Sequence, residues 1–434
     1  MLKTSFEKLK KYNWRLWVSL CVLALVPAIY QSIRTLLISV TSSASGIDII
    51  GQMEWYDLID ETIKAFLIVP LYAILNKVYI KQFDLLPKVI FKSLIIVVIL
   101  YALFNVGVLY YGNKLVSYMN PQENDIVTIS NYLKLETFAF MIGIIPSFFN
   151  VVFVVLEKSK NIYICLFVQV VMGIINDFIL IPRLQVNGVA ISNLITNLIL
   201  AIIEYIVVYK QGFISISKFT KEDNKLFINW AKIGLFSGIQ QFIDNIVYAL
   251  MISRMVNMVS EQGNYWVANN FIWGWLLIPV SAMSEVIKSD CKECRKVIRS
   301  NYYLLSIFIF TIWLISVPLW LPFLRNVQQL DNASNILDIL FKLVPFYIAY
   351  TLCIIPDSIF IATGHSHLNA INSMIINFAY YGIWFILYKN VIISFDMNKI
   401  ILMFGYGMVV HLVVSLIEQY IYDHKYDKEL VKIE

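Results

Sequence analysis

The stretch GIQQFIDNIVY at residues 238–248 places one carboxylate, Asp244, in a strongly apolar segment. A charge at the centre of a bilayer costs about 2.5–3.5 kcal/mol on insertion scales, so such residues usually face the bundle interior and mark ion or substrate paths. Gln240, one helical turn away, and the neighbouring Asn245 supply polar groups around the acid. Asp244 is therefore a candidate for binding a proton or Na+. The alternative is a structural ion pair with a buried cation.

Asp357 is a second candidate for the same cation-coupling site. It follows Pro356, and a proline inside a helix leaves a carbonyl oxygen free, which could serve as a cation ligand. The alternative is an acid that reaches water at the inner end of its helix. Asp177, near the outer end of another apolar segment, is expected to cap a helix or touch water.

Several cations also fall inside apolar segments. Arg34 could bind a phosphate or carboxylate group in a bidentate manner, or its side chain could reach outward to the lipid headgroups. Lys64 follows Asp60 by four residues and Lys342 follows Asp338 by four, so each lysine can pair with an acid on its own helix face.

The elements that position these residues are long apolar helices. Of the 434 residues, 59% are hydrophobic and 15% are charged, against about 25% charged in a soluble domain. The sequence therefore predicts an all-α polytopic membrane protein without a separate soluble domain, and the modest net charge of +5 gives no case for nucleic acid. Twelve segments are long enough to span a bilayer: 14–41, 57–79, 89–112, 127–156, 160–181, 187–209, 226–257, 264–287, 300–324, 334–362, 367–389 and 397–421.

Lysine and arginine are distributed unevenly between the two sides of the membrane. With the N-terminus inside, 23 of the 34 lysines and arginines fall in inner loops and tails and 5 in outer loops. Because inner loops carry the excess of cations, both termini are predicted to be cytoplasmic. As a separate expectation, the membrane is the cell membrane of a bacterium.

The sequence also contains an internal repeat. Gln31 aligns with Gln241 and Pro146 with Pro356 at an offset of 210 residues, and Pro70 aligns with Pro279 at an offset of 209. The repeat predicts two parallel six-helix halves, 1–209 and 226–434, joined by a cytoplasmic linker at 210–225, with a cleft between the halves. Asp244 then aligns with Arg34, and the two could pair across the cleft as a gate. The residues predicted to line this substrate cleft are Arg34, Gln31, Gln241, Lys134, Lys342 and Tyr248.

Two local patterns carry a family resemblance. Asn176 with NGVAIS at 187–192, and Gly238 followed six residues later by Asp244, resemble the multidrug and toxic compound extrusion (MATE) transporters, whose superfamily also holds the lipid-linked oligosaccharide and lipid II flippases. The chain has no acid between Glu7 and Asp48, where many bacterial members carry an aspartate late in the first span. This departure argues against a coupling site in the N-terminal half.

The resemblance implies secondary active export of an amphipathic compound by alternating access, coupled to H+ or Na+. The alternative is a flippase for a lipid-linked anionic precursor, with Arg34, Lys134 and Lys342 receiving the phosphates. A scaffold or receptor would explain the repeat but not the buried charges. No Walker A motif or catalytic triad is present, and the CKEC sequence at 291–294 lacks a second cysteine pair for zinc. We therefore expect a monomer that is not an enzyme, with no cofactor besides the coupling ion.

Overall fold

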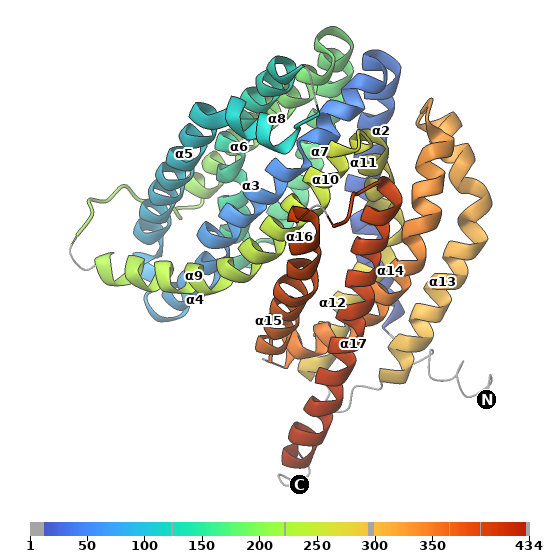
Figure 1. The fold of residues 1–434 in the computed structure, drawn as a ribbon. Coiled ribbons are helices and arrows are strands. Elements are labelled where there is room, and N and C mark those ends of the chain that lie inside the picture. Colours follow the sequence, from blue (N-terminus) through green and yellow to red (C-terminus); the bar gives the residue numbers. More distant parts are fainter. Residues whose placement is uncertain are drawn as a thin grey trace. The chain divides into compact units, whose positions relative to one another are not determined.

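The structure is a computed structural model that describes residues 13–122, 125–220, 223–293, 299–363, 365–390 and 392–430. The side chains at 42–45, 223–226, 229, 236–237, 240, 290–293, 299–300 and 425–430 lie outside this description. Every regular element in the described residues is helical (Figure 1). The α-helices are α2 (Trp14–Gln52), α3 (Glu54–Leu67), α4 (Val69–Lys81), α5 (Leu86–Met119), α6 (Ile126–Val155), α7 (Ser159–Leu184), α8 (Val186–Lys210), α9 (Asp223–Tyr248), α10 (Arg254–Met258), α11 (Gln262–Phe271), α12 (Ile278–Glu293), α13 (Arg299–Pro322), α14 (Ala333–Ala362), α15 (His367–Met374), α16 (Gly382–Lys389) and α17 (Met397–Leu430).

A short 3₁₀ helix and several π-helical turns complete the chain. The 3₁₀ helix Phe83–Leu85 precedes α5. π-helical turns lie between consecutive helices at Ala249–Ser253, Ile272–Leu276 and Ile375–Tyr381, and a fourth, Phe323–Val327, extends the end of α13. Such turns insert an extra residue into a helix without ending it, so α9 continues into α10 and α15 into α16.

The described helices confirm a multi-pass membrane protein. Among the residues that the structure describes, nine helices are long and apolar enough to cross a bilayer, and the pair Gln262–Leu276 and Ile278–Ser289, bent by 48°, makes up to ten. Large apolar side chains such as Ile80, Leu314 and Ile315 are mostly exposed, which suits a surface against lipid tails. The predicted count of twelve spans, the repeat and the cytoplasmic termini stay predictions.

The predicted span 57–79 is two helices, α3 and α4, that meet at Ile68. Pro70 stands in the first turn of α4, where its missing N–H is tolerated and where it disfavours a continuous helix. Helix α3 contains Asp57, Asp60 and Glu61, and it is not among the helices apolar enough to span. A broken, acidic helix thus occurs within an otherwise apolar chain.

Packing divides the chain into two compact units. Unit 1 comprises Met1–Ser32 and Asn264–Glu434, and unit 2 comprises Ile33–Gly263. Helix α2 therefore contributes its first part to unit 1 and the remainder to unit 2. The predicted halves 1–209 and 226–434 rest on the sequence repeat and stay a prediction.

Unit 2 has an apolar core formed mainly by α4, α5, α6 and α8, with Phe148, Phe149 and Phe153 fully buried in it. Helix α9 runs alongside α3 and α4 (Figure 1). Gly234 allows this close approach, because a Cβ there would lie 2.4 Å from the Phe66 carbonyl oxygen. The Trp230 indole also donates a 3.1 Å hydrogen bond to the Leu67 carbonyl oxygen. Helix α9 is thus held against the acidic helix α3.

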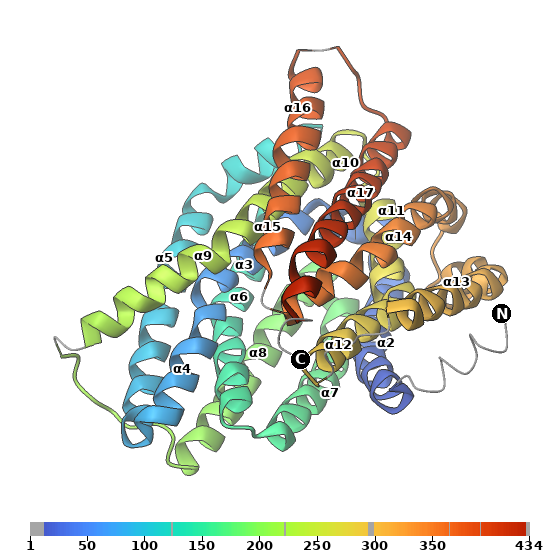
Figure 2. The same ribbon diagram turned by 90° about the horizontal axis from the view of Figure 1, so that it is seen from below.

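In unit 1, α14 packs along α17, and both lie next to the α15–α16 helix (Figure 2). Small residues permit this contact: a Cβ at Gly405 of α17 would lie 2.2 Å from the Phe346 ring of α14. Asn372 of α15, fully buried, donates hydrogen bonds to Ser415 Oγ at 2.8 Å and to the His411 carbonyl oxygen at 3.3 Å. These three helices therefore share a polar interior.

Candidate functional site

A buried ion pair joins α2 and α7 in unit 2. Arg34 Nε and Nη2 donate hydrogen bonds to Asp177 Oδ2 and Oδ1 at 2.9 and 3.1 Å. The Arg34 side chain is 10% exposed and the Asp177 side chain 0%. The expectation that Asp177 caps a helix or touches water is therefore wrong. Two parallel N–H···O bonds fix the plane of the guanidinium as well as its charge.

The ion pair continues into a chain of polar contacts between α7, α8 and α6. Arg34 Nη2 also donates to Asn193 Oδ1 at 2.8 Å, and Asn193 Nδ2 donates to Glu136 Oε1 at 2.9 Å. Glu136 is 6% exposed, and within the described residues its second oxygen, Oε2, has no hydrogen-bond partner. A buried carboxylate oxygen without a donor is costly when the group is ionised, so this oxygen is suited to carrying a proton.

Helix α3 brings further carboxylates beside Glu136. Asp57 lies close enough to Glu136 for the two groups to interact electrostatically. Asp57 and Glu61, one helical turn apart, are exposed, whereas Asp60 is buried. We call Asp57, Asp60, Glu61 and Glu136 the α3–α6 carboxylate cluster.

Asp60 is the neutralised member of this cluster. Lys64 Nζ contacts Asp60 Oδ2 at 2.5 Å, as the spacing of four residues predicted, and the Tyr101 hydroxyl donates to Asp60 Oδ1. Lys64 also lies over the Phe140 ring, 5.4 Å from its centroid. Lys64 is also near enough to interact electrostatically with Glu61 and Glu136, so this single lysine stands against the four acids of the cluster.

Buried aromatic and hydroxyl groups hold α3 against α5 and α6. Tyr56 is 1% exposed, and its hydroxyl lies 2.9 Å from both Asn105 Oδ1 and Thr137 Oγ1. Its ring stacks on Phe140 at 5.1 Å between centroids. The acidic face of α3 is thus fixed in position, which is what an ion site requires.

The predicted residues of α9 also contact α3. Asn245 Nδ2 donates to the Leu58 carbonyl oxygen at 2.9 Å and to Thr62 Oγ1 at 3.1 Å, and Gln241 Nε2 donates to Asn245 Oδ1 at 2.9 Å. These contacts fasten α9 to α3. Asp244 and Tyr248 are half-buried in the same helix, and the side chain of Gln240 lies outside the described residues.

The structure divides the remaining predicted residues between the units. Lys134 lies in unit 2 on α6, half-buried. In unit 1, Lys342 pairs with Asp338, as the spacing of four predicted, and donates to Asn398 Oδ1 at 2.7 Å on an exposed surface. Gln31 and Asp357 are also in unit 1. Arg34, Asp244, Asn245, Gln241 and Lys134 are therefore in one unit, and Gln31, Lys342 and Asp357 in the other.

Asp357 contacts a histidine that the sequence did not single out. Asp357 Oδ2 lies 3.1 Å from His411 Nε2, and Ser415 Oγ donates to Asp357 Oδ1 at 2.9 Å. Among the residues that the structure describes, no group of three or more His, Cys, Asp or Glu side chains could hold a metal ion.

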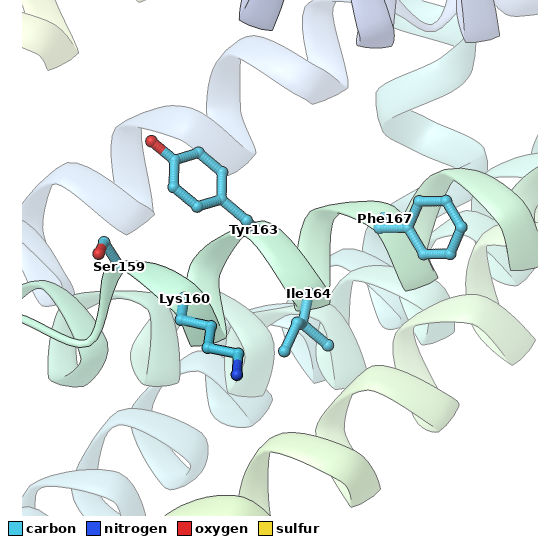
Figure 3. A pocket seen from close by; sticks show the side chains of 5 residues that line it. All are labelled: Ser159, Lys160, Tyr163, Ile164 and Phe167. Atoms are coloured by element: carbon cyan, nitrogen blue, oxygen red, sulfur yellow. The ribbon is translucent and has the colours of Figure 1, made fainter.

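One hollow of about 480 Å³ lies at the start of α7 (Figure 3). Its lining comes from a single helix: Ser159, Lys160, Tyr163, Ile164 and Phe167. Phe167 and Asp177 are ten positions apart, about 15 Å along a helix. The hollow is therefore separate from the Arg34–Asp177 pair, and the exposed Tyr163 and Phe167 give it an apolar surface.

Buried charges inside a bundle of apolar helices are characteristic of membrane transporters as a class. Comparison with solved structures places the fold within that class. An inward-facing multidrug resistance MATE family transporter of the MOP superfamily is similar over 96% of this chain and 98% of its own, with a TM-score of 0.73 and 15% identity. An outward-facing form of such a transporter gives a TM-score of 0.64, at 15% identity over 97% and 98% of the two chains.

A third structure is a MOP superfamily transporter from Pyrococcus furiosus, described as having a binding pocket of reverse polarity. It is similar with a TM-score of 0.65 and 15% identity, over 96% of this chain and 97% of its own. No protein-family model matches the sequence, and no curated protein matches it. The chain therefore has the fold of the MATE transporters of the MOP superfamily.

Proposed function

We propose that this protein is a secondary active transporter in the cell membrane of a bacterium. It exports amphipathic compounds, cationic ones in particular, by alternating access coupled to a proton or sodium gradient. The fold supports alternating access, because similar structures include both inward-facing and outward-facing forms. The partners are the small-molecule substrate and the surrounding lipid, and we expect the unit of function to be a monomer.

Glu136 is the observation that carries this proposal. Its carboxylate is buried in the membrane-spanning helix α6, one oxygen bonds to Asn193, and the other has no donor within the described residues. Asp57 beside it disfavours a second negative charge. A proton or another monovalent cation would remove both costs, so the occupancy of this site can differ between transport states.

The charges close to Arg34 and to the α3–α6 carboxylate cluster favour a cationic substrate over the flippase alternative. Arg34 is committed to Asp177 in a bidentate contact and is only 10% exposed, so it is poorly placed to receive a phosphate. Around it, the α3–α6 carboxylate cluster has more acids than cations. The exposed carboxylates Asp57 and Glu61 would attract a lipophilic amine and repel a phosphate.

Transport by purified protein in liposomes tests the proposal. A fluorescent lipophilic cation is the substrate, and a proton gradient or a sodium gradient is imposed separately. We expect one gradient to drive transport in the wild type and Glu136→Gln to abolish the gradient dependence, because glutamine cannot exchange a proton. Asp84→Asn, at an exposed carboxylate of the short helix before α5, is the control and should behave as the wild type.

Asp244→Asn examines the coupling role predicted for Asp244 in the same assay. Gradient-driven transport that is unchanged in both Glu136→Gln and Asp244→Asn would refute coupling through these carboxylates. Transport of a fluorescent anionic lipid in place of the cation would support the flippase alternative.

A further inference from the structure

A second cluster of titratable groups lies in unit 1, between α14 and α17. His411, Ser415 and Glu418 follow at spacings of four and three residues, so they lie on one face of α17. This face meets Asp357 of α14: His411 Nε2 is 3.1 Å from Asp357 Oδ2, and Ser415 Oγ is 2.9 Å from Asp357 Oδ1. Glu418 is near enough to interact electrostatically with both His411 and Asp357.

Glu418 is the unexplained member of this cluster. It is 7% exposed, and neither of its carboxylate oxygens has a hydrogen-bond partner in the described part of the chain. Ser415 cannot supply the missing donor, because its single O–H is used on Asp357 while its oxygen accepts from Asn372. An ionised Glu418 would therefore be a buried charge without a donor, whereas a protonated one is neutral.

Charge balance requires the cluster to hold protons. Asp357 and Glu418 are acids, and His411 is positive only when both ring nitrogens carry hydrogen. With His411 and Glu418 both protonated, the three groups sum to zero. Each proton that leaves then adds a net negative charge to a membrane-embedded interior.

The neighbouring groups do not supply a compensating cation among the described side chains. Cys353 and Tyr350, one and two turns before Asp357 on α14, interact with it and are neutral in their ordinary forms. Asn369 and Asn372 of α15 contribute amides. On α12, which packs against α14, the nearest described charges are Glu285 and Lys288, which pair with each other.

We propose that Asp357, His411 and Glu418 form a proton-binding site of unit 1. His411 holds one proton at Nε2 against Asp357, and Glu418 holds a second on its carboxyl group behind it. The side chains of His411 and Asp357 are 30% and 18% exposed, so a proton can leave the cluster by way of His411. Proton binding by this cluster does not depend on the proposed function. Its release during transport rests on the proposed function, and it would make H+ the coupling ion at this site.

Infrared difference spectroscopy of the full chain in liposomes tests proton binding without any transported substrate. The pH is stepped between about 8 and 5, the range in which histidine changes charge. We expect the wild type to show imidazole bands and the C=O band of a carboxyl group that gains a proton. Because other buried carboxyls such as Glu136 can also absorb there, Glu418→Gln should lose one component of the C=O absorption, and His411→Gln should lose one set of imidazole bands.

If the three groups form one site, a substitution at one of them must also change the infrared bands of the others. Glu418→Gln and Asp357→Asn should each shift the bands of His411. The control His365→Gln removes a histidine that contacts Thr363 in a turn, and it should leave the C=O band unchanged. A carboxyl C=O absorption identical in wild type and Glu418→Gln, or His411 bands identical in wild type, Asp357→Asn and Glu418→Gln, would overturn the proposal. If Glu418→Gln does not fold, the Asp357→Asn and His411→Gln spectra still decide it.

Transport provides a separate readout. If the proposed function holds, His411→Gln and Glu418→Gln should lose transport driven by a proton gradient while they still bind the fluorescent cation. If the wild type transports nothing, the proposed function is refuted. The infrared spectra then still decide whether Asp357, His411 and Glu418 bind protons.

Discussion

Asp177→Asn is expected to destabilise the protein strongly, because it leaves the Arg34 guanidinium buried without its counterion. Arg34 cannot lose its charge in a protein, and its side chain is 10% exposed. Removing one partner of a buried ion pair costs about 3–5 kcal/mol. Asn193 still accepts from Arg34 at 2.8 Å, so we place the loss at the lower end, about 3 kcal/mol, or roughly 100-fold in the folded-to-unfolded ratio.

The double variant Arg34→Met with Asp177→Leu should recover most of this loss. It removes both charges and fills the space with apolar atoms, a change that is often neutral or stabilising. We expect it to lie within about 1 kcal/mol of the wild type. Arg34→Met alone should cost less than Asp177→Asn at acidic pH, because a carboxylate can take up a proton whereas a guanidinium cannot lose one.

The assay is unfolding of the purified protein by SDS in mixed micelles, followed by circular dichroism and tryptophan fluorescence. Asp338→Asn is the matched control, since its ion pair with Lys342 has side chains that are 61% and 40% exposed. It should cost no more than about 1 kcal/mol. The reasoning is refuted if Asp177→Asn is no more harmful than Asp338→Asn, or if the double variant is as unstable as the single one.

Three further predictions use the same unfolding assay. Gly188→Ala should destabilise by about 1–3 kcal/mol, because the new Cβ would lie 2.5 Å from the Leu180 carbonyl oxygen, whereas Gly107→Ala, with nothing within 4 Å, should be neutral or stabilising. Tyr56→Phe should cost about 1–3 kcal/mol, since the hydroxyl lies 2.9 Å from both Asn105 and Thr137, and a stability equal to wild type would show that these contacts contribute nothing. Asp396 caps α17, and the backbone N–H of Lys399 lowers the pKa of its carboxyl. The stabilisation by the Asp396 carboxylate should be complete above the ordinary aspartate pKa of about 3.9, and it should disappear as the pH falls through the lower pKa of the folded protein. The free energies of unfolding of wild type and Asp396→Ala should therefore differ by about 0.5–1 kcal/mol near neutral pH and converge in acid.

The membrane-spanning helices could be predicted from the sequence because each is a long apolar run. The structure departs from the prediction where the chain is polar. Segment 57–79 has the length of a span, but Asp57, Asp60 and Glu61 make its first half too charged, and the helix breaks before Pro70. The span predicted at 57–79 therefore stays a prediction.

The internal repeat did not reveal the ion-pair partner of Arg34. The offset of 210 residues aligned Arg34 with Asp244, but an internal repeat relates equivalent positions and says nothing about which residues touch. The bidentate partner of Arg34 is Asp177, 143 residues away on α7. Asp177 looked like an end-of-helix residue because sequence shows only its distance from the loop, and its complete burial depends on how α2, α7 and α8 pack.

Glu136 was missed for a related reason, although the sequence contained a signal for it. Its contacts, Asn193 on α8 and Asp57 on α3, are distant in sequence, and local spacing to Lys134 gives no pairing. The signal lies in the neutralisation of α3. Helix α3 has one lysine, Lys64, which pairs with Asp60 at a spacing of four, so a single cation stands against the four acids of this helix. Unbalanced carboxylates inside a membrane chain need a partner from outside their helix, and in a transporter fold a mobile cation can fill that role. An excess of acids left after local pairing is therefore the sequence signal for the cation site that we propose at Glu136, and the coupling role of Asp244 stays a prediction.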